Sequence, residues 1–249
     1  YDATATQRWH RRAGFDAVFI TDHNTVEGFR STPDTPDLCR GIEVSAWRAH
    51  IVLLGATAPV DRSRYGGDLD GLLDLLRTSE SEYGALSVAS IPEYEQNHWG
   101  RLDTLIGAGL DGFEVVNAAP KANEMGRERR DSVIALARRT GRFVVGVSDH
   151  HGWGATSMIW NLVRASRWRE SGHGACPAVL EQLRTGFAAV RVVERHRLRA
   201  DAWWPAWLTP VGMVWESWRS MGPALTLSWL VWIWVVASIG VLARPPSRE

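Results

Sequence analysis

The sequence predicts an α/β domain built on a mostly parallel sheet, closed or open, followed by a helix that spans a membrane. Short apolar, β-branched runs alternate with helical patterns over residues 1–195, and this alternation is typical of parallel sheets. Residues 220–243 contain no charged side chain. The chain has 249 residues, a length that a single α/β barrel can reach.

The expected strands are short runs that end at turn-forming residues. They cover 16–21, 41–45, 50–54, 86–89, 112–117, 143–148 and 188–193. The expected helices have apolar residues at helical spacing, and they cover 4–13, 69–83, 101–108, 124–140 and 176–185. Asp68 and Pro177 suit helix starts. Glycines follow four of the helical patterns and suit helix ends, at Gly14, Gly84, Gly141 and Gly186.

Composition excludes several classes of protein. Lys plus Arg and Asp plus Glu both number 28, so the formal net charge is zero, and a nucleic-acid binder driven by bulk positive charge is not expected. Cys39 and Cys176 lie far apart without CxxC spacing, which argues against a disulfide framework and a structural zinc finger. Read as isolated thiols, they leave the redox compartment open.

The C-terminal region is expected to attach the protein to a membrane. A helix over the charge-free run 220–243 is long enough to cross a hydrocarbon core of roughly 30 Å. The alternative is a buried core helix. Tryptophan is concentrated just before the run, and it favours membrane interfaces. The expected domains are a soluble domain over 1–195, a Trp-rich juxtamembrane segment over 196–219, the span over 220–243 and a tail over 244–249. The side of the membrane is not determined.

Carboxylates and imidazoles stand at the ends of the expected strands. They are Asp22, His23, Glu43, His50, Asp149, His150 and His151. In a barrel the C-terminal strand ends converge on one face. Imidazole nitrogen and carboxylate oxygen suit zinc, manganese or iron. The plain structural alternatives are a strand-end histidine at His23, a buried ion pair at Glu43 and a solvated loop at 149–151.

These residues lie in a series of segments whose order resembles that of a known protein family. In order, the segments read FDAVFITDHNT, GIEVSAWRAHIVLLG, a strand followed by Pro92, GLDGFEVVN and VVGVSDHHGW. The succession, over about residues 1–193, resembles the PHP superfamily (polymerase and histidinol phosphatase domain). The resemblance implies a distorted (β/α)7, TIM-like barrel with two or three divalent ions at the C-terminal strand ends. It also implies phosphoester hydrolysis, in which a metal-bound hydroxide attacks phosphorus.

The resemblance assigns roles to individual residues. It implies metal ligands at His23, Glu43, His50, Asp149 and His151, with Glu43 bridging two ions and His150 in a variable position. Asp22 would support or contact the metal site. On this basis the expected catalytic residues are Asp22, His23, Glu43 and Asp149.

The chain departs from the family pattern at two points. A His-x-His pair on the first strand would lie upstream of Tyr1, so the chain is expected to be a fragment. Ile91 stands where the family has a metal-binding histidine before Pro92. Glu93 or His98 from the following loop is the alternative ligand. His10, in RWHRR, is expected on the surface of a helix.

The leading hypothesis is a membrane-anchored, metal-dependent phosphoesterase that acts on a small-molecule or lipid-linked phosphoester. The alternative is a non-catalytic PHP-like binding module with a degenerate metal site, which Ile91 motivates. A nuclease or proofreading role is disfavoured because the net charge is zero and a membrane span is expected.

Overall fold

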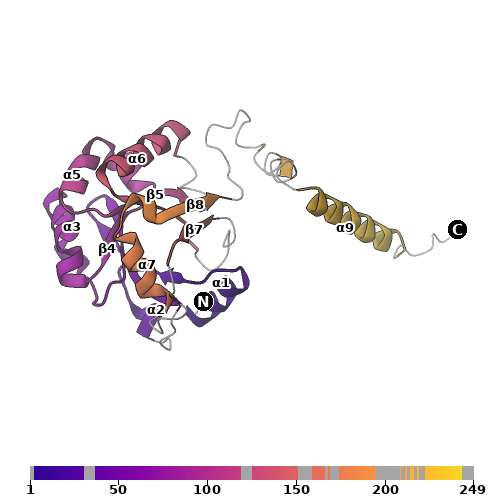
Figure 1. Ribbon diagram of the computed structural model, residues 1–249, viewed down its shortest axis with the longest axis horizontal. Coiled ribbons are helices and arrows are strands. Elements are labelled where there is room, and N and C mark those ends of the chain that lie inside the picture. Colours follow the sequence, from indigo (N-terminus) through magenta and orange to yellow (C-terminus); the bar gives the residue numbers. More distant parts are fainter. Residues whose placement is uncertain are drawn as a thin grey trace. The chain divides into compact units, whose positions relative to one another are not determined.

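Figure 1 shows a computed structural model of the chain. It describes residues 3–30, 37–118, 125–150, 159–165, 168, 174–194, 208, 211, 214–215, 218 and 222–242. The chain divides into two compact units, Tyr1–Asp201 and Ala202–Glu249. The expected metal-site residues all fall in the first unit.

The first unit is built on a six-stranded sheet in the order β1 to β6. The strands are β1 (Val18–Ile20), β2 (Leu38–Ala46), β3 (Ala49–Leu54), β4 (Leu86–Ala89), β5 (Gly112–Asn117) and β6 (Phe143–Val147). The pairs β1–β2, β4–β5 and β5–β6 are parallel, whereas β3 runs antiparallel to both β2 and β4. A separate antiparallel pair consists of β7 (Ile159–Val163) and β8 (Val190–Glu194).

The expected (β/α)7 barrel is wrong, because the sheet is a curled half-barrel. β2 turns directly into β3 at Trp47 and Arg48, and a connection without a crossover helix gives antiparallel strands. Beyond β6, a side chain rather than a strand pairs with the backbone. The Gly146 backbone N donates to Asn161 Oδ1 (2.9 Å), and Asn161 Nδ2 donates to the Gly146 carbonyl (2.7 Å). Within the described ranges, β1 has a strand partner only in β2, so the sheet does not close.

The helices of the first unit lie around the sheet (Figure 1). They are α1 (Ala3–Arg12), α2 (Glu27–Arg30), α3 (Leu69–Tyr83), α4 (Glu93–Asn97), α5 (Leu102–Gly107), α6 (Arg127–Thr140) and α7 (Ala175–Leu183). Short 3-10 turns lie at Arg62–Arg64, Trp99–Arg101 and Phe187–Ala189. The ends of α3 and α6 confirm the expected stops: Gly84 (φ 64°) and Gly141 (φ 70°) adopt the left-handed conformation that glycine favours.

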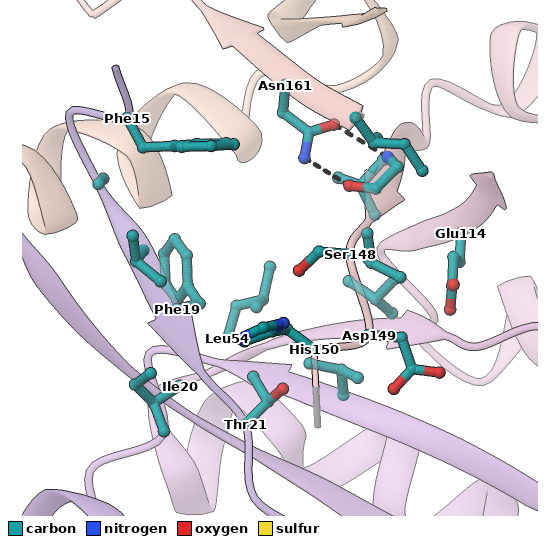
Figure 2. Close-up of a pocket in the computed structure, with 18 of the residues that line it drawn as sticks. Phe15, Phe19, Ile20, Thr21, Leu54, Glu114, Ser148, Asp149, His150 and Asn161 are labelled. Atoms are coloured by element: carbon teal, nitrogen blue, oxygen red, sulfur yellow. Dashed lines mark hydrogen bonds between the residues drawn. The ribbon is translucent and has the colours of Figure 1, made fainter. Parts of the chain in front are cut away.

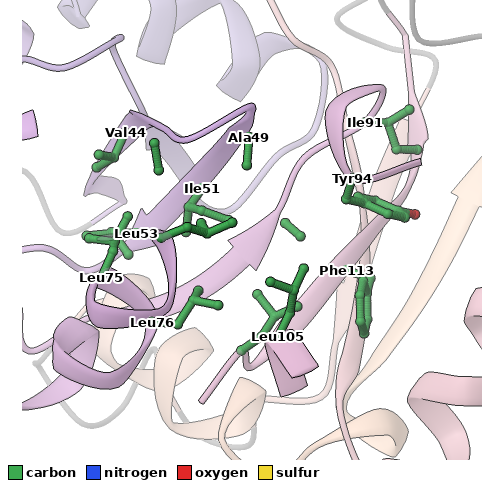
Figure 3. Close-up of a cluster of buried hydrophobic side chains, with 14 of the residues drawn as sticks. Val44, Ala49, Ile51, Leu53, Leu75, Leu76, Ile91, Tyr94, Leu105 and Phe113 are labelled. Atoms are coloured by element: carbon green, nitrogen blue, oxygen red, sulfur yellow. The ribbon is translucent and has the colours of Figure 1, made fainter. Parts of the chain in front are cut away.

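The main hydrophobic core lies between the outer face of the sheet and helices α3 and α5 (Figure 3). Side chains alternate along β3, as the strand period requires. Ile51 and Leu53 point outward into this core, where they meet α3 residues such as Leu75. The alternate β3 side chains, His50, Val52 and Leu54, face the inner side. The outer core therefore fixes which residues reach the interior of the half-barrel.

A disulfide joins Cys39 in β2 to Cys176 in α7, with a Cα–Cα distance of 5.3 Å. The interpretation of the two cysteines as isolated thiols is therefore wrong. Their separation of 137 residues concealed the pairing, because strand and helix are brought together only by the fold. The bond fixes the start of α7 to the sheet.

The described helix of the second unit is α9 (Pro223–Leu242). Among the residues that the structure describes, no helix is both long enough and apolar enough to cross a membrane. This finding overturns the expected span at 220–243, and with it the expected membrane anchorage and membrane localisation. The expectation weighed the absence of charge, but the run is interrupted by Trp, Ser, Thr and Gly. Leu, Ile, Val and Phe are the residues that insert with a clearly favourable free energy.

Candidate metal centre

Three potential ligands meet where the first three strands of the sheet lie side by side. His23 follows β1 and forms a parallel bridge with Glu43 in β2. His50 lies in β3, where it pairs with Ser45 of β2. Because β3 is antiparallel to β2, the start of β3 lies at the same edge as the end of β2. His50 therefore reaches the site although the expected barrel does not form.

The loop that carries His23 is tied to β2 on both sides. The Glu43 backbone N donates to the Asp22 carbonyl (3.1 Å), and the Asn24 backbone N donates to the Glu43 carbonyl (2.8 Å). Asn24, in the left-handed region (φ 55°), also bonds Ser45 through both side-chain amide atoms, at 2.8 and 2.9 Å. These bonds hold His23 beside Glu43.

The ligand atoms of His23, Glu43 and His50 lie within 4.8 Å of one another. One oxygen of Glu43 lies 3.6 Å from Nε2 of His23, and the other lies 3.1 Å from Nδ1 of His50. Two imidazoles and one carboxylate form a donor set that suits zinc, iron or manganese and leaves coordination positions open. The geometry therefore fits a divalent ion.

The electrostatic environment of these ligands is negative. The pKa of His50 is raised, mainly by its hydrogen bond to Glu43 and also by the charges of Glu93 and Asp149, while burial acts in the opposite direction. A cation would be stabilised by the same carboxylates. Metal binding would compete with protonation of His50, because only neutral imidazole binds a metal.

Of the two alternatives to Ile91, Glu93 lies beside the ligand group and His98 does not. Glu93 Oε1 is 3.5 Å from Nδ1 of His50, and its Oε2 is buried without a hydrogen-bond partner among the described residues. His98 is instead fully buried, its Nε2 lies 3.1 Å from the Arg48 carbonyl, and it lines no part of the pocket described below. Ile91 packs into the main core.

Glu114 is a candidate residue that the sequence reasoning missed. Its side chain points to the inner face of β5, where the Ile91 backbone N donates to Oε2 (3.1 Å), whereas Oε1 has no partner among the described residues. Burial, and secondarily the charges of Asp149 and Glu43, raise its pKa well above the ordinary value. The signal was available: Glu114 is the only charged residue in β5, as Glu43 is within its own apolar segment.

The other expected site residues have mixed outcomes. Asp149 follows β6 in the left-handed region (φ 46°), and Asn117 donates to its Oδ2 (3.3 Å). Asp22 lines the pocket, with its carboxylate packed against Gly28 of α2. His151 lies outside the described residues, so its role as a ligand stays a prediction. Of the described residues, neither Asp149 nor Asp22 belongs to the three-residue ligand group.

His150 lines the cavity but is not part of the ligand group, and its ring lies near α1. Its ring is 5.7 Å from that of His10, in an edge-on arrangement. His10 is buried, and its Nδ1 lies 2.8 Å from the Thr6 carbonyl, so the expectation of a surface histidine is wrong. The helical face was misjudged because arginines surround His10 in the sequence.

The candidate centre opens into a cavity of about 1120 Å³ on the inner side of the half-barrel. Figure 2 shows Glu114 and Asp149 across this cavity from Phe15 and Phe19. The cavity is thus polar along one edge and apolar over much of the rest. Comparison of the chain with protein-family models and with curated proteins found no match. The resemblance to the PHP superfamily therefore stays a prediction from the motifs.

Proposed function

We propose that the first unit is a metal-dependent hydrolase of phosphoesters. The observation that carries the proposal is the convergence of His23, Glu43 and His50 within 4.8 Å, at the edge of a cavity that can hold a substrate. A divalent ion bound there would polarise a phosphoryl oxygen and lower the pKa of a coordinated water. The order of the motifs, which resembles that of the PHP superfamily, supports the phosphoester class.

The protein's own residues would position the substrate and the ion. Glu43 places one oxygen beside each imidazole, and this orients both rings. Glu93 and Asp149 add negative charge around His50. A phosphate group would be repelled by these carboxylates unless a cation compensates them. Substrate binding is therefore expected to depend on the metal.

The buried carboxylates provide a further indication that the site is built for a cation. An uncompensated buried polar atom costs free energy, in general about 1–3 kcal/mol, and more for a charged group. Glu93 Oε2 and Glu114 Oε1 are both buried without a partner among the described residues. Both residues line the same cavity as the ligand group. A nearby cation would reduce this cost. Zinc, manganese and iron fit the donor set.

A second candidate is a non-catalytic binding module with a degenerate metal site. The observation that favours it is Ile91, which is buried in the core at the position where a ligand is expected. Phosphoester hydrolysis by a two-metal mechanism needs at least two adjacent ions. Elemental analysis of the purified protein separates the candidates: two or three ions per chain support the hydrolase, whereas one or none supports the binding module.

The hydrolase proposal is tested with Glu43→Ala and Asp149→Ala. Each variant is assayed on a generic phosphodiester with zinc or manganese present, and far-ultraviolet circular dichroism checks the fold. Both variants are expected to lose activity. The matched control is Glu80→Ala, because Glu80 is an exposed carboxylate of α3 whose ion pair with Arg184 lies outside the cavity. Full activity in both cavity variants would overturn the proposal.

A further inference from the structure

The inner face of the half-barrel carries a second apolar cluster that does not form a closed core. Its buried members are Leu54, Leu86, Val88, Phe143, Val145 and Leu183. Several further members, such as Phe19 and Val52, are only partly buried. Both groups contribute to the wall of the 1120 Å³ cavity. An apolar group that covers this surface is bound favourably, because the contact removes apolar area from water.

The inner face of β3 carries a polar residue at its start and apolar residues at the next two inward positions. His50, Val52 and Leu54 share the inner face of the strand and all line the cavity. At about 3.4 Å per residue, Val52 lies about 7 Å from His50 along the strand, and Leu54 lies about 14 Å away. The apolar wall therefore begins directly below the candidate ligands.

The neighbouring strands continue this apolar layer. Val88 of β4 is the register partner of Val52. Val145 of β6 belongs to the same inner cluster and also lines the cavity, as does Phe19 of β1. An apolar layer thus surrounds the space below the metal centre on several strands. We name this space, lined by Phe19, Val52, Leu54, Val88 and Val145, the apolar chamber.

We propose that the apolar chamber binds an alkyl or arylalkyl group of the substrate while the phosphate lies at the metal centre. The substrate class is then an amphiphilic phosphoester rather than a sugar or nucleotide phosphate. The inference rests on the proposed function for the phosphate end, but not for the apolar end. The cavity volume of about 1120 Å³ slightly exceeds the usual range for small-molecule sites, about 300–1,000 Å³, so there is room for both ends of such a ligand.

The test measures binding rather than turnover. Methyl-, butyl- and octylphosphonate, which resist hydrolysis, are titrated as monomers into zinc-loaded protein by isothermal titration calorimetry. Each added methylene is expected to lower Kd by up to about fourfold, the equivalent of about 0.8 kcal/mol, until the chain reaches Leu54. The heat capacity change of binding is expected to become more negative with chain length. A Kd independent of chain length would overturn the inference.

A matched pair of variants places the effect in the apolar chamber. Val52→Phe fills the chamber and is expected to weaken octylphosphonate binding at least tenfold, with methylphosphonate unchanged. The control is Ile106→Phe, because Ile106 is a partly buried residue of α5 that packs on the outer core and lines no part of the cavity. If Val52→Phe does not fold, Val52→Thr tests the same wall at constant volume. Equal octylphosphonate affinity in the wild type and the folded Val52 variant would contradict the inference.

The two proposals fail in different ways. Chain-length-dependent binding without hydrolysis of any phosphoester would overturn the proposed function and leave the apolar chamber supported. Hydrolysis of methyl and octyl esters with equal kcat/KM, together with equal phosphonate affinities, would overturn the chamber and leave the hydrolase supported. Binding of an extended apolar peptide in place of the phosphonates would also overturn the chamber as a substrate site.

Discussion

Removal of the disulfide is expected to lower the stability of the first unit by a large amount. The bond between Cys39 and Cys176 joins residues with a sequence separation of 137. For a loop of about this length, the chain-entropy relation gives a loss of about 17 cal/mol/K, or about 5 kcal/mol at 25 °C. Residual structure in the reduced unfolded chain lowers this value, so 5 kcal/mol is the upper figure.

The assay compares the oxidised wild type with the double variant Cys39→Ala/Cys176→Ala. Urea unfolding followed by tryptophan fluorescence gives the free energy of unfolding, and calorimetry gives Tm. For a domain of 150–250 residues, a loss of about 5 kcal/mol corresponds to a Tm lower by about 10–20 °C. Unfolding of the reduced wild type supplies the control: it isolates the bond from the small cavity left at Cys39, which is fully buried.

Three results would refute this reasoning. The first is the same urea midpoint for the oxidised wild type and the double variant, which would show that the bond constrains nothing in the unfolded chain. The second is the titration of two free thiols per chain in the denatured, unreduced protein, which would show that the bond does not form. A reduced wild type that is as stable as the oxidised form would contradict the entropic argument in the same way.

Three further predictions concern a buried histidine, a glycine contact and the metal ligands. Burial lowers the pKa of His98 below its ordinary value of 6.5, so the unfolded state binds more protons than the folded state. The free energy of unfolding therefore falls as pH drops below about 6.5. Between pH 7.5 and 5.5, His98→Asn is expected to lose less of this free energy than the wild type, as measured by urea unfolding. Gly112→Ala would place a Cβ 2.3 Å from the buried Phe143 ring and is expected to cost about 1–3 kcal/mol, while Gly107→Ala, with nothing within 4 Å, should cost none. Zinc at about 100 times its Kd is expected to stabilise the wild type by about 2.7 kcal/mol, and Glu43→Gln should abolish most of the Tm shift.

Local features of the fold were predictable because their causes are local. The strands over 86–89 and 112–117 have the bounds that their apolar runs indicated, and α3 begins and ends as expected. Strand pairing was not predictable in this way. The β2–β3 turn carries Arg48 at φ 48° rather than glycine or asparagine, so a hairpin was not indicated there. β7 (Ile159–Val163) was missed because Asn161 interrupts its apolar residues.

The candidate site was more predictable than the barrel. His23, Glu43 and His50 were expected together from their places at strand ends, and the structure brings them within 4.8 Å of one another. That expectation used a parallel barrel, but an antiparallel β3 brings His50 to the same edge. Glu93 was expected as an alternative ligand, and a single charge in the apolar run 112–117 was a signal for Glu114. The bond from the Ile91 backbone to Glu114 joins distant segments, so no sequence pattern specifies it.

The geometry of the metal centre follows from the packing of the outer core. On β2, Ile42 and Val44 flank Glu43 and are fully buried on the opposite face. A shift of β2 by one residue would turn Glu43 into the core and expose both neighbours, since side chains alternate between the two faces. The hydrophobic free energy of two aliphatic side chains, about 1.5–3 kcal/mol each, opposes that shift. The same alternation places Val52 below His50 on β3. The apolar neighbours thus hold the ligands and the chamber in register with each other.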